Sequence, residues 1–293
     1  MKNVLLYILT ASIWGSTWLA IKFQLGVVDP LLSVAYRFLL SAIILLIYCR
    51  LSGRNLYFSP RQHAWLMVQG FTLFGFHYWL VYTAEVYLPS GLVSVVFSTI
   101  MFWNVVFGAL FLNAPIRRQV VFGGIIGILG IILVFKDELL KFSFSSETSV
   151  ATLICVLAAM IASVGNIVSV QNGRIGIPVF QINAYGMLYG SLQMMLIAIL
   201  FGKTFTFEFT PAYISSILYL AIFGSVVAFS AYLTLIGNIG ADKAGYVTLI
   251  FPIIALGLST VFENYAWNAL SLLGVALVLM GNLMILQRKK HVG

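Results

Sequence analysis

The sequence predicts an all-α membrane protein, with ten transmembrane helices arranged as two inverted five-helix repeats. The first observation is composition: of 293 residues, 61% are hydrophobic and 8% are charged, whereas soluble proteins are roughly half apolar and a quarter charged. The second is that the apolar residues form runs of about twenty, the length of helix that crosses a bilayer. The third is that one pattern of helix, turn and helix occurs twice, which indicates an internal repeat.

The runs are apolar on most of their faces, and this property excludes strands. Barrel strands alternate apolar and polar residues with a period of two, and open sheets cannot cross lipid. The first run is too long for a signal-peptide core and no small-residue cleavage site follows it, so we expect a retained span. The spans are predicted at residues 3–22, 31–50, 64–84, 89–112, 118–135, 149–171, 179–201, 212–236, 241–262 and 268–287.

The repeated pattern is an apolar helix, a short turn and a second helix with two glycines seven residues apart. It occurs once in each half of the chain. The longest polar break, from Lys136 to Glu147, separates the halves and is expected to be a solvated linker. We therefore predict one repeat at residues 1–142 and the other at residues 148–293. The two stretches are 88–113 followed by Gly123 and Gly130, and 240–265 followed by Gly274 and Gly281.

Several short motifs carry a family resemblance. They are Trp14-Gly15-Ser16, Pro30 to Arg37-Phe38, Leu88-Pro89-Ser90-Gly91-Leu92-Val93, Phe251-Pro252 and Phe262-Glu263. With them the chain resembles the EamA-type repeat of the drug/metabolite transporter superfamily. The resemblance implies two five-helix repeats and outward transport of a small metabolite, such as an amino acid or a related compound. Many members end the fourth helix with a glycine-glutamate pair, where this chain has Asn113-Ala114; the acid is present only in the second repeat, as Glu263.

Charge placement predicts the orientation. If the N-terminus is cytoplasmic, eleven Lys and Arg residues fall in inner segments and four in outer segments, while seven of the eight acidic residues fall outside. This is the positive-inside bias of an inner or plasma membrane protein with both termini in the cytoplasm. The net charge of +8 therefore reflects topology and not nucleic-acid binding. The inner cations are Lys2, Arg50, Arg54, Arg61, Arg117, Arg118, Arg174, Lys243, Arg288, Lys289 and Lys290; the outer ones are Lys22, Lys136, Lys141 and Lys203.

The first two spans supply candidate substrate contacts. Trp14 and Trp18 share one helical stripe, where indoles either stack on a substrate or pack against neighbours. Lys22, near the outer end, is expected to extend toward the headgroups. Arg37 lies seven residues past Pro30, about 10 Å into the membrane at 1.5 Å per residue. Because a charge at that depth is costly in lipid, Arg37 should face the protein interior. There it binds either a substrate carboxylate or a structural group such as Glu85.

The third and fourth spans add polar and aromatic candidates in the outer half. Tyr78 and Tyr82 are candidate substrate contacts, and His77 is both a substrate contact and, with Glu85, a candidate for proton coupling, because imidazole titrates near neutral pH. The alternative is a neutral histidine bonded to a carbonyl or a tyrosine. In the fourth span, Ser98 belongs to a polar side formed by small residues and is a further candidate substrate contact.

The second repeat supplies the remaining candidates. Asn166 lies mid-membrane and needs a partner, either a neighbouring helix or a substrate. Tyr185 and Tyr189 share a stripe of the seventh span, and Tyr185 matches Arg37 when each is counted from its proline. In the ninth span, Thr248 precedes Pro252; a proline there frees a backbone carbonyl and either acts as a hinge or merely bends the helix.

Catalytic chemistry has no support in the motifs. The sequence lacks HExxH, Gly-x-Ser-x-Gly and glycine-rich phosphate loops, and its three histidines, His63, His77 and His291, lie at different depths. Cys49 and Cys155 lie near opposite ends of their spans, too far apart for a disulfide. We therefore expect no catalytic residues, no metal and no cofactor.

These observations predict a secondary transporter that works by alternating access, since inverted repeats place a substrate site at their interface. Its expected partners are a small-molecule substrate and the lipid bilayer, with no nucleic acid; the oligomeric state stays open. Two alternatives remain. A membrane-embedded enzyme for a lipid or prenyl substrate would need acids or histidines gathered at the inner face, where only Asp242 is found. A channel or scaffold would lack saturable counterflow.

Overall fold

The structure, a computed structural model, describes residues 2–113, 116, 118–134, 136, 146–239, 244 and 247–286. Every element in these ranges is a helix, as the composition predicted, and no strand occurs among them. The helices begin and end within a few residues of the predicted bounds. Most of the predicted linker, the start of the span predicted at 241–262, Asp242 and the basic residues after 286 lie outside the described residues.

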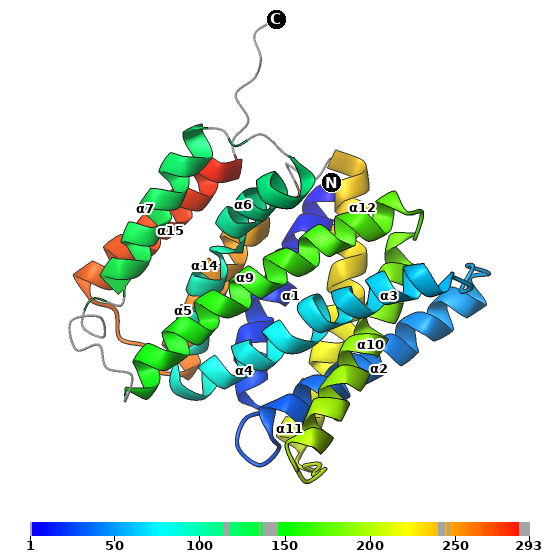
Figure 1. The fold of residues 1–293 in the computed structure, drawn as a ribbon. Coiled ribbons are helices and arrows are strands. Elements are labelled where there is room, and N and C mark those ends of the chain that lie inside the picture. The colour runs from blue at the N-terminus through cyan, green and yellow to red at the C-terminus, as the bar shows by residue number, and fades with distance from the viewer. Residues whose placement is uncertain are drawn as a thin grey trace, which may run out of the picture.

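The helices of the first half follow one another with short connections (Figure 1). Three of them, α3, the π-helix η1 and α4, are continuous in sequence, and a two-residue turn separates α5 from α6. The bounds are α1 Lys2–Lys22, α2 Pro30–Leu51, α3 Pro60–Gln69, η1 Gly70–Phe76, α4 His77–Tyr87, α5 Ser90–Phe97, α6 Ile100–Leu112 and α7 Arg118–Val134.

The second half has a similar order of elements. Here α11, the π-helix η2 and α12 are continuous in sequence. The bounds are α9 Glu147–Arg174, α10 Val179–Leu200, α11 Pro211–Tyr219, η2 Leu220–Val227, α12 Ala228–Ile239, α14 Val247–Phe262 and α15 Ala269–Leu286.

Helix starts follow from local sequence. The Asp29 carboxylate accepts a hydrogen bond from the Leu31 amide at 2.9 Å, with Pro30 as the first residue of α2. Ser59 forms a capping box with Gln62 at the start of α3. Such caps satisfy the free N–H groups at a helix N-terminus, and proline is suited to the first turn because it lacks an N–H.

Six helices in the described part of the chain are long and apolar enough to cross a membrane. Many large apolar side chains point outward from them, as expected for surfaces facing lipid. The six are Lys2–Lys22, Pro30–Leu51, Ser90–Leu112, Glu147–Arg174, Val179–Leu200 and Pro211–Tyr232; shorter apolar helices lie at Arg118–Val134, Val247–Phe262 and Ala269–Ile285.

Helices of the two halves pack on one another throughout the bundle. These pairs include α1 with α14, α2 with α10, α4 with α9, α5 with α14 and α7 with α15. In Figure 1 α7 and α15 lie side by side at one edge of the bundle, and α2 and α10 lie together at the opposite edge. The π-helices also cross between halves, η1 against α10 and η2 against α2. The first half therefore does not form a separate body.

Candidate functional site

Arg37 is the centre of the candidate site. It lies on α2 and is only 1% exposed, so the prediction that it faces the protein interior is confirmed. Its guanidinium lies over the Phe38 ring at 5.0 Å and over the Tyr78 ring at 4.8 Å, measured to the ring centroids. These are cation–π distances, at which the ring faces partly replace the lost hydration of the charge.

The hydrogen bonds of Arg37 are few and long. One nitrogen donates to the Tyr82 hydroxyl and another to Ser225 Oγ, each at 3.5 Å. The buried Nε has no hydrogen-bond partner among the described residues. Neither ion pair formed by described residues includes Arg37, so Glu85 is not its salt-bridge partner. A guanidinium carries five N–H donors, and this one therefore keeps donor capacity for another acceptor.

Tyr82 is held in place by a residue outside the predicted set. Its hydroxyl donates to Gln24 Oε1 at 2.7 Å while it accepts the bond from Arg37. Gln24 is buried, and its Nε2 has no partner among the described residues. The connection between α1 and α2 thus supplies a second unsatisfied donor close to Arg37.

A polar side chain near Arg37 lies in one π-helix, and another directly follows the other π-helix. In η2, Ser225 donates to the Leu220 carbonyl five residues earlier at 3.0 Å. At the end of η1, His77 Nδ1 contacts the Thr72 carbonyl, also five residues earlier, at 2.9 Å. Because a carbonyl only accepts, the Nδ1 atom carries the proton. π-helical turns are uncommon and are often found at functional sites.

The aromatic candidates of α1 lie against the same cluster. Trp14 donates its indole N–H to the Gly224 carbonyl, next to Ser225, at 3.3 Å. Trp18 packs against the rings of Phe97 and Phe251 at centroid distances of 5.3 and 5.9 Å. The structure therefore brings together Trp14, Trp18, Arg37, His77, Tyr78 and Tyr82, and Pro252 lies next to one of the rings that contact Trp18.

Three predicted residues lie elsewhere in the helical interfaces. Ser98 Oγ accepts a hydrogen bond from Asn282 of α15 at 2.9 Å. Thr248 contacts Met101 Sδ at 2.9 Å. Asn166 donates to Asn104 Oδ1 at 3.1 Å, and Ser163 donates to the same oxygen at 2.8 Å. Of the two partners considered for Asn166, a neighbouring helix or a substrate, the structure shows the neighbouring helix, α6.

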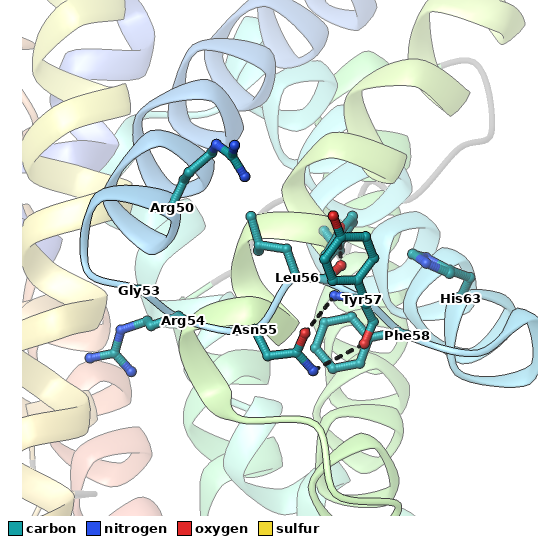
Figure 2. Close-up of a pocket in the computed structure, with 9 residues that line it drawn as sticks. Arg50, Gly53, Arg54, Asn55, Leu56, Tyr57, Phe58 and His63 are labelled. Atoms are coloured by element: carbon teal, nitrogen blue, oxygen red, sulfur yellow. Dashed lines mark hydrogen bonds between the residues drawn. The ribbon is translucent and has the colours of Figure 1, made fainter.

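Tyr185 and Tyr189 are not with Arg37 but at the end of the bundle where α2 ends, here called the Arg54 end. Tyr185 donates to the Leu56 carbonyl at 2.7 Å, and the Tyr189 hydroxyl bonds His63 Nδ1 at 2.8 Å. Figure 2 shows the pocket beside Tyr185, with residues 53–58 of the loop between α2 and α3 along one side. The volume of this pocket is about 510 Å³. Its lining residues are Arg50, Gly53, Arg54, Asn55, Leu56, Tyr57, Phe58, His63 and Tyr185.

Glu85 lies at the opposite end of the bundle, here called the Glu263 end. It is completely buried, and neither carboxylate oxygen has a hydrogen-bond partner among the described residues. The prediction that Lys22 extends toward the headgroups is wrong. Its Nζ donates to the carbonyls of Glu85 and Leu88 at 2.5 and 2.8 Å and lies 3.4 Å from the Glu263 carboxylate. These acceptors hold the ammonium within the protein.

Sequence reasoning missed Gln24 and the ion pair of Lys22; Ser225 was visible as a polar residue of the eighth span, but nothing in the sequence placed it beside Arg37. Ser225 and Gln24 are uncharged polar residues with no special spacing, and their role depends on which helix packs against α2. Among the described residues, no three His, Cys, Asp or Glu side chains lie close enough together to hold a metal ion.

Comparison with known proteins gives consistent results. The model of the EamA-like transporter family matches residues 1–136 and 150–287. The chain is 25% identical to "Protein PagO" of Salmonella typhimurium, over 94% of this chain and 90% of that protein. It is 29% identical to the "Uncharacterized inner membrane transporter YedA" of Escherichia coli, with 92% and 87% covered. A crystal structure of a chain 20% identical superposes with a TM-score of 0.69, covering 96% and 95%.

Proposed function

This chain belongs to the EamA-like transporter family, and from that premise we propose that it is a secondary transporter that exports small carboxylate-bearing metabolites, such as amino acids or related compounds, by alternating access. The observation that carries the substrate class is the buried Arg37 with its unpartnered Nε. Ionisable residues inside membrane spans are rare and often mark substrate or ion pathways. A carboxylate matches the two parallel donors of a guanidinium, which makes it the natural ligand for this group.

The surroundings of Arg37 support a small organic cargo. Tyr78 and Phe38 offer ring faces, while Ser225 and Tyr82 offer hydroxyls. Trp14 lies next to them, through its bond to Gly224. Since Arg37 is 1% exposed, cargo reaches it only when helices move apart, as alternating access requires.

The architecture proposed for this cycle is ten spans in two inverted repeats, at residues 1–142 and 148–293. Corresponding features recur with one spacing: Asn113 and Asn264, the only described non-glycine residues with positive φ, are 264 − 113 = 151 positions apart. The glycine pairs repeat with the same spacing, since 274 − 123 and 281 − 130 are both 151. The two π-helices, beginning at residues 70 and 220, follow the same order. The two segments matched by the family model support this division.

The contact between α7 and α15 supports the inversion. A Cβ on Gly123 would lie 2.6 Å from the Gly281 carbonyl oxygen, and one on Gly130 would lie 2.5 Å from that of Gly274. Gly123 corresponds to Gly274, and Gly130 to Gly281. Each glycine of α7 therefore contacts the residue of α15 that corresponds to the other glycine of α7. A two-fold axis between the helices produces this contact pattern. An odd number of spans per repeat then makes the second half cross in the opposite sense.

The proposed orientation places the Arg54 end in the cytoplasm and the Glu263 end outside. Cysteines introduced at Arg54 and Arg118, in a Cys49→Ser, Cys155→Ser background, are expected to react with an impermeant maleimide only from the cytoplasmic side. The reason is the excess of Lys and Arg in the inner segments. Labelling of the two positions from opposite sides of the membrane contradicts the proposed threading.

The pocket at the Arg54 end is proposed as the cytoplasmic entrance. Arg50 and Arg54 supply positive charge, and Tyr185 and His63 supply ring edges. The candidate contacts Tyr185 and Tyr189 thus act before cargo reaches Arg37. Charged groups at an entrance raise the local concentration of an oppositely charged solute.

Proton coupling is proposed at His77 and Glu85. His77 lies against Tyr78, with ring centroids 4.2 Å apart, and so contacts the ring on which Arg37 stacks. Glu85 is buried without a hydrogen-bond partner for its carboxylate. In export driven by inward proton flow, His77 and Glu85 would bind a proton on the outer side and release it on the inner side.

The experiment that tests the function combines binding and flux. Purified protein is screened by thermal shift against amino acids, nucleosides and sugars, and stabilising compounds are assayed in proteoliposomes. We expect stabilisation by a carboxylate-bearing compound, saturable counterflow of it, and a faster rate with an imposed pH gradient. Flux without counterflow indicates a channel and rejects the transporter proposal. A rate independent of the pH gradient rejects proton coupling alone.

A further inference from the structure

Four helix ends meet at the Glu263 end through one ion pair. Glu263 follows α14, and its carboxylate accepts hydrogen bonds from the Ser90 amide at 3.1 Å and from Ser90 Oγ, at the start of α5. Lys22, the last residue of α1, lies 3.4 Å from Glu263. The same ammonium binds the carbonyls of Glu85 and Leu88 at the end of α4. The pair therefore connects α1, α4, α5 and α14.

The charges lie where helix ends favour them. The N-terminus of α5 carries partial positive charge and free N–H groups, which suit the Glu263 carboxylate, while the C-terminus of α4 carries partial negative charge and free carbonyls, which suit Lys22. Because α4 and α5 meet at the turn around Leu88, one pair stabilises both ends of that turn. The side chains of Lys22 and Glu263 are 24% and 15% exposed, so solvent screens the pair only in part.

We propose that Lys22 and Glu263 form the outer gate of the transport cycle, and that Glu85 is the alternative partner of Lys22 when the gate opens. The inference rests on the proposed function and its orientation. In the closed gate Glu263 connects α14, from the second half, to α5, from the first half. Outward opening separates α14 from α5 and removes Glu263 from Lys22.

Glu85 provides a second carboxylate for Lys22 once the gate has opened. Lys22 would otherwise be left as an unpaired, partly buried charge, which is costly. Lys22 already binds the backbone carbonyl of Glu85, and the side-chain carboxylate of that residue is buried without a hydrogen-bond partner. Lys22 thus lies beside two acidic residues: in the present state it pairs with the Glu263 carboxylate and binds Glu85 only through the backbone carbonyl.

The proline of α14 supplies the means for this motion. Pro252 lies eleven residues before Glu263, about 16 Å at 1.5 Å per residue. It removes one backbone hydrogen bond from the middle of the helix. The segment after Pro252 can therefore swing with Glu263 at its tip, consistent with the hinge predicted from the sequence.

The chain carries its own reporter of gate opening. Cys155, on α9, is completely buried and contacts the Val93 carbonyl of α5 at 3.5 Å. Val93 is less than one helical turn below Ser90, so Cys155 lies directly behind the gate. The remaining cysteine, Cys49, is also buried and lies near the end of α2, toward the Arg54 end. In a Cys49→Ser protein, labelling from outside reports on Cys155 alone.

The test measures the rate at which an impermeant maleimide, added outside intact cells, labels Cys155 of the full chain. We expect slow labelling in the Cys49→Ser protein and at least about tenfold faster labelling after Lys22→Met or Glu263→Gln, since hydrogen bonds to charged groups are among the stronger ones. Glu263→Gln keeps an acceptor for the Ser90 amide and serves where Lys22→Met fails to fold, as judged by size-exclusion elution. In the double variant Glu263→Gln, Glu85→Gln, labelling is expected to be slower than in Glu263→Gln alone. The open state then lacks the Glu85 carboxylate that is proposed to pair with Lys22.

The matched control is Lys203→Met. Among the described residues, Lys203 forms a second ion pair at this end, 2.6 Å from Asp29, with side chains 43% and 24% exposed. This pair involves neither α5 nor α14. The labelling rate of Lys203→Met should equal that of the Cys49→Ser protein.

Three outcomes overturn the gate: unchanged labelling in both gate variants, equal acceleration by Lys203→Met, or no slowing when Glu85→Gln is added. The labelling assay needs no cargo, so a negative labelling result does not contradict the proposed transport function. If labelling responds as expected but proteoliposomes show no flux, only the proposed function is rejected.

Discussion

Replacing Arg37 with methionine is expected to reduce the flux of a carboxylate cargo by at least about tenfold and to leave the folded protein no less stable. The lost hydrogen bonds to a charged group are worth about 1.5–3 kcal/mol, which corresponds to roughly 10–150-fold in affinity. The measurement is initial counterflow in proteoliposomes, with the compound identified by thermal shift. Arg37→Lys keeps the positive charge but lacks the two parallel N–H donors, so its flux should lie between those of wild type and Arg37→Met.

The stability half of this prediction separates a substrate contact from a structural arginine. Removing one partner of a buried, well-bonded ion pair costs about 3–5 kcal/mol, whereas replacing poorly paired buried charge with an apolar group is often neutral or stabilising. Arg37 has only two hydrogen bonds of 3.5 Å and no partner for Nε. The melting temperature of Arg37→Met should therefore equal or exceed that of wild type.

Arg61→Met is the control, because Arg61 is an exposed cation on α3 that makes no contact with the Arg37 cluster. Both its flux and its melting temperature should be unchanged. A large drop in melting temperature for Arg37→Met would instead assign Arg37 a structural role. Full flux in a well-folded Arg37→Met protein would remove the basis for the carboxylate cargo.

The helices could be predicted from the sequence because their cause is local. A run of twenty apolar residues has one low-energy state in lipid, and caps such as Asp29 and Ser59 are visible as letters. Much of the Arg37 cluster was also predictable, since a buried charge and the aromatic stripes of α1 and α4 all have to face the protein interior.

The contacts between distant helices were not predictable in the same way. A stripe shows which residues share a face, but not which helix covers it. Tyr185 was grouped with Arg37 by its distance from a proline, yet it bonds the Leu56 carbonyl at the Arg54 end. Lys22 was assigned to the headgroups because nothing local to α1 reveals the carbonyls of α4 or the carboxylate after α14. The π-helices had no sequence signal either, because their altered hydrogen bonding depends on the helices packed against them.

Gly130→Ala is expected to lower the free energy of unfolding by roughly 1–3 kcal/mol, the usual cost of overpacking a tight interface. The added Cβ would lie 2.5 Å from the Gly274 carbonyl oxygen and 2.7 Å from the Val278 backbone nitrogen. Both are backbone atoms, which cannot rotate away, so α7 and α15 would have to separate. Close approach through small residues is what drives helix association in lipid. The measurement is thermal melting in detergent, together with the monodisperse fraction.

The matched control lies one turn away on the same helix. A Cβ on Gly127 would meet no atom within 4 Å, and alanine favours helix over glycine by about 1 kcal/mol. Gly127→Ala should therefore be neutral or stabilising, opposite in sign to Gly130→Ala. Gly274→Ala, whose Cβ would lie 2.6 Å from the Gly130 oxygen, should destabilise by a similar amount, because the two-fold relation gives both helices the same contact. Equal effects of Gly127→Ala and Gly130→Ala would show that helix propensity, and not the close approach of α7 and α15, governs this pair.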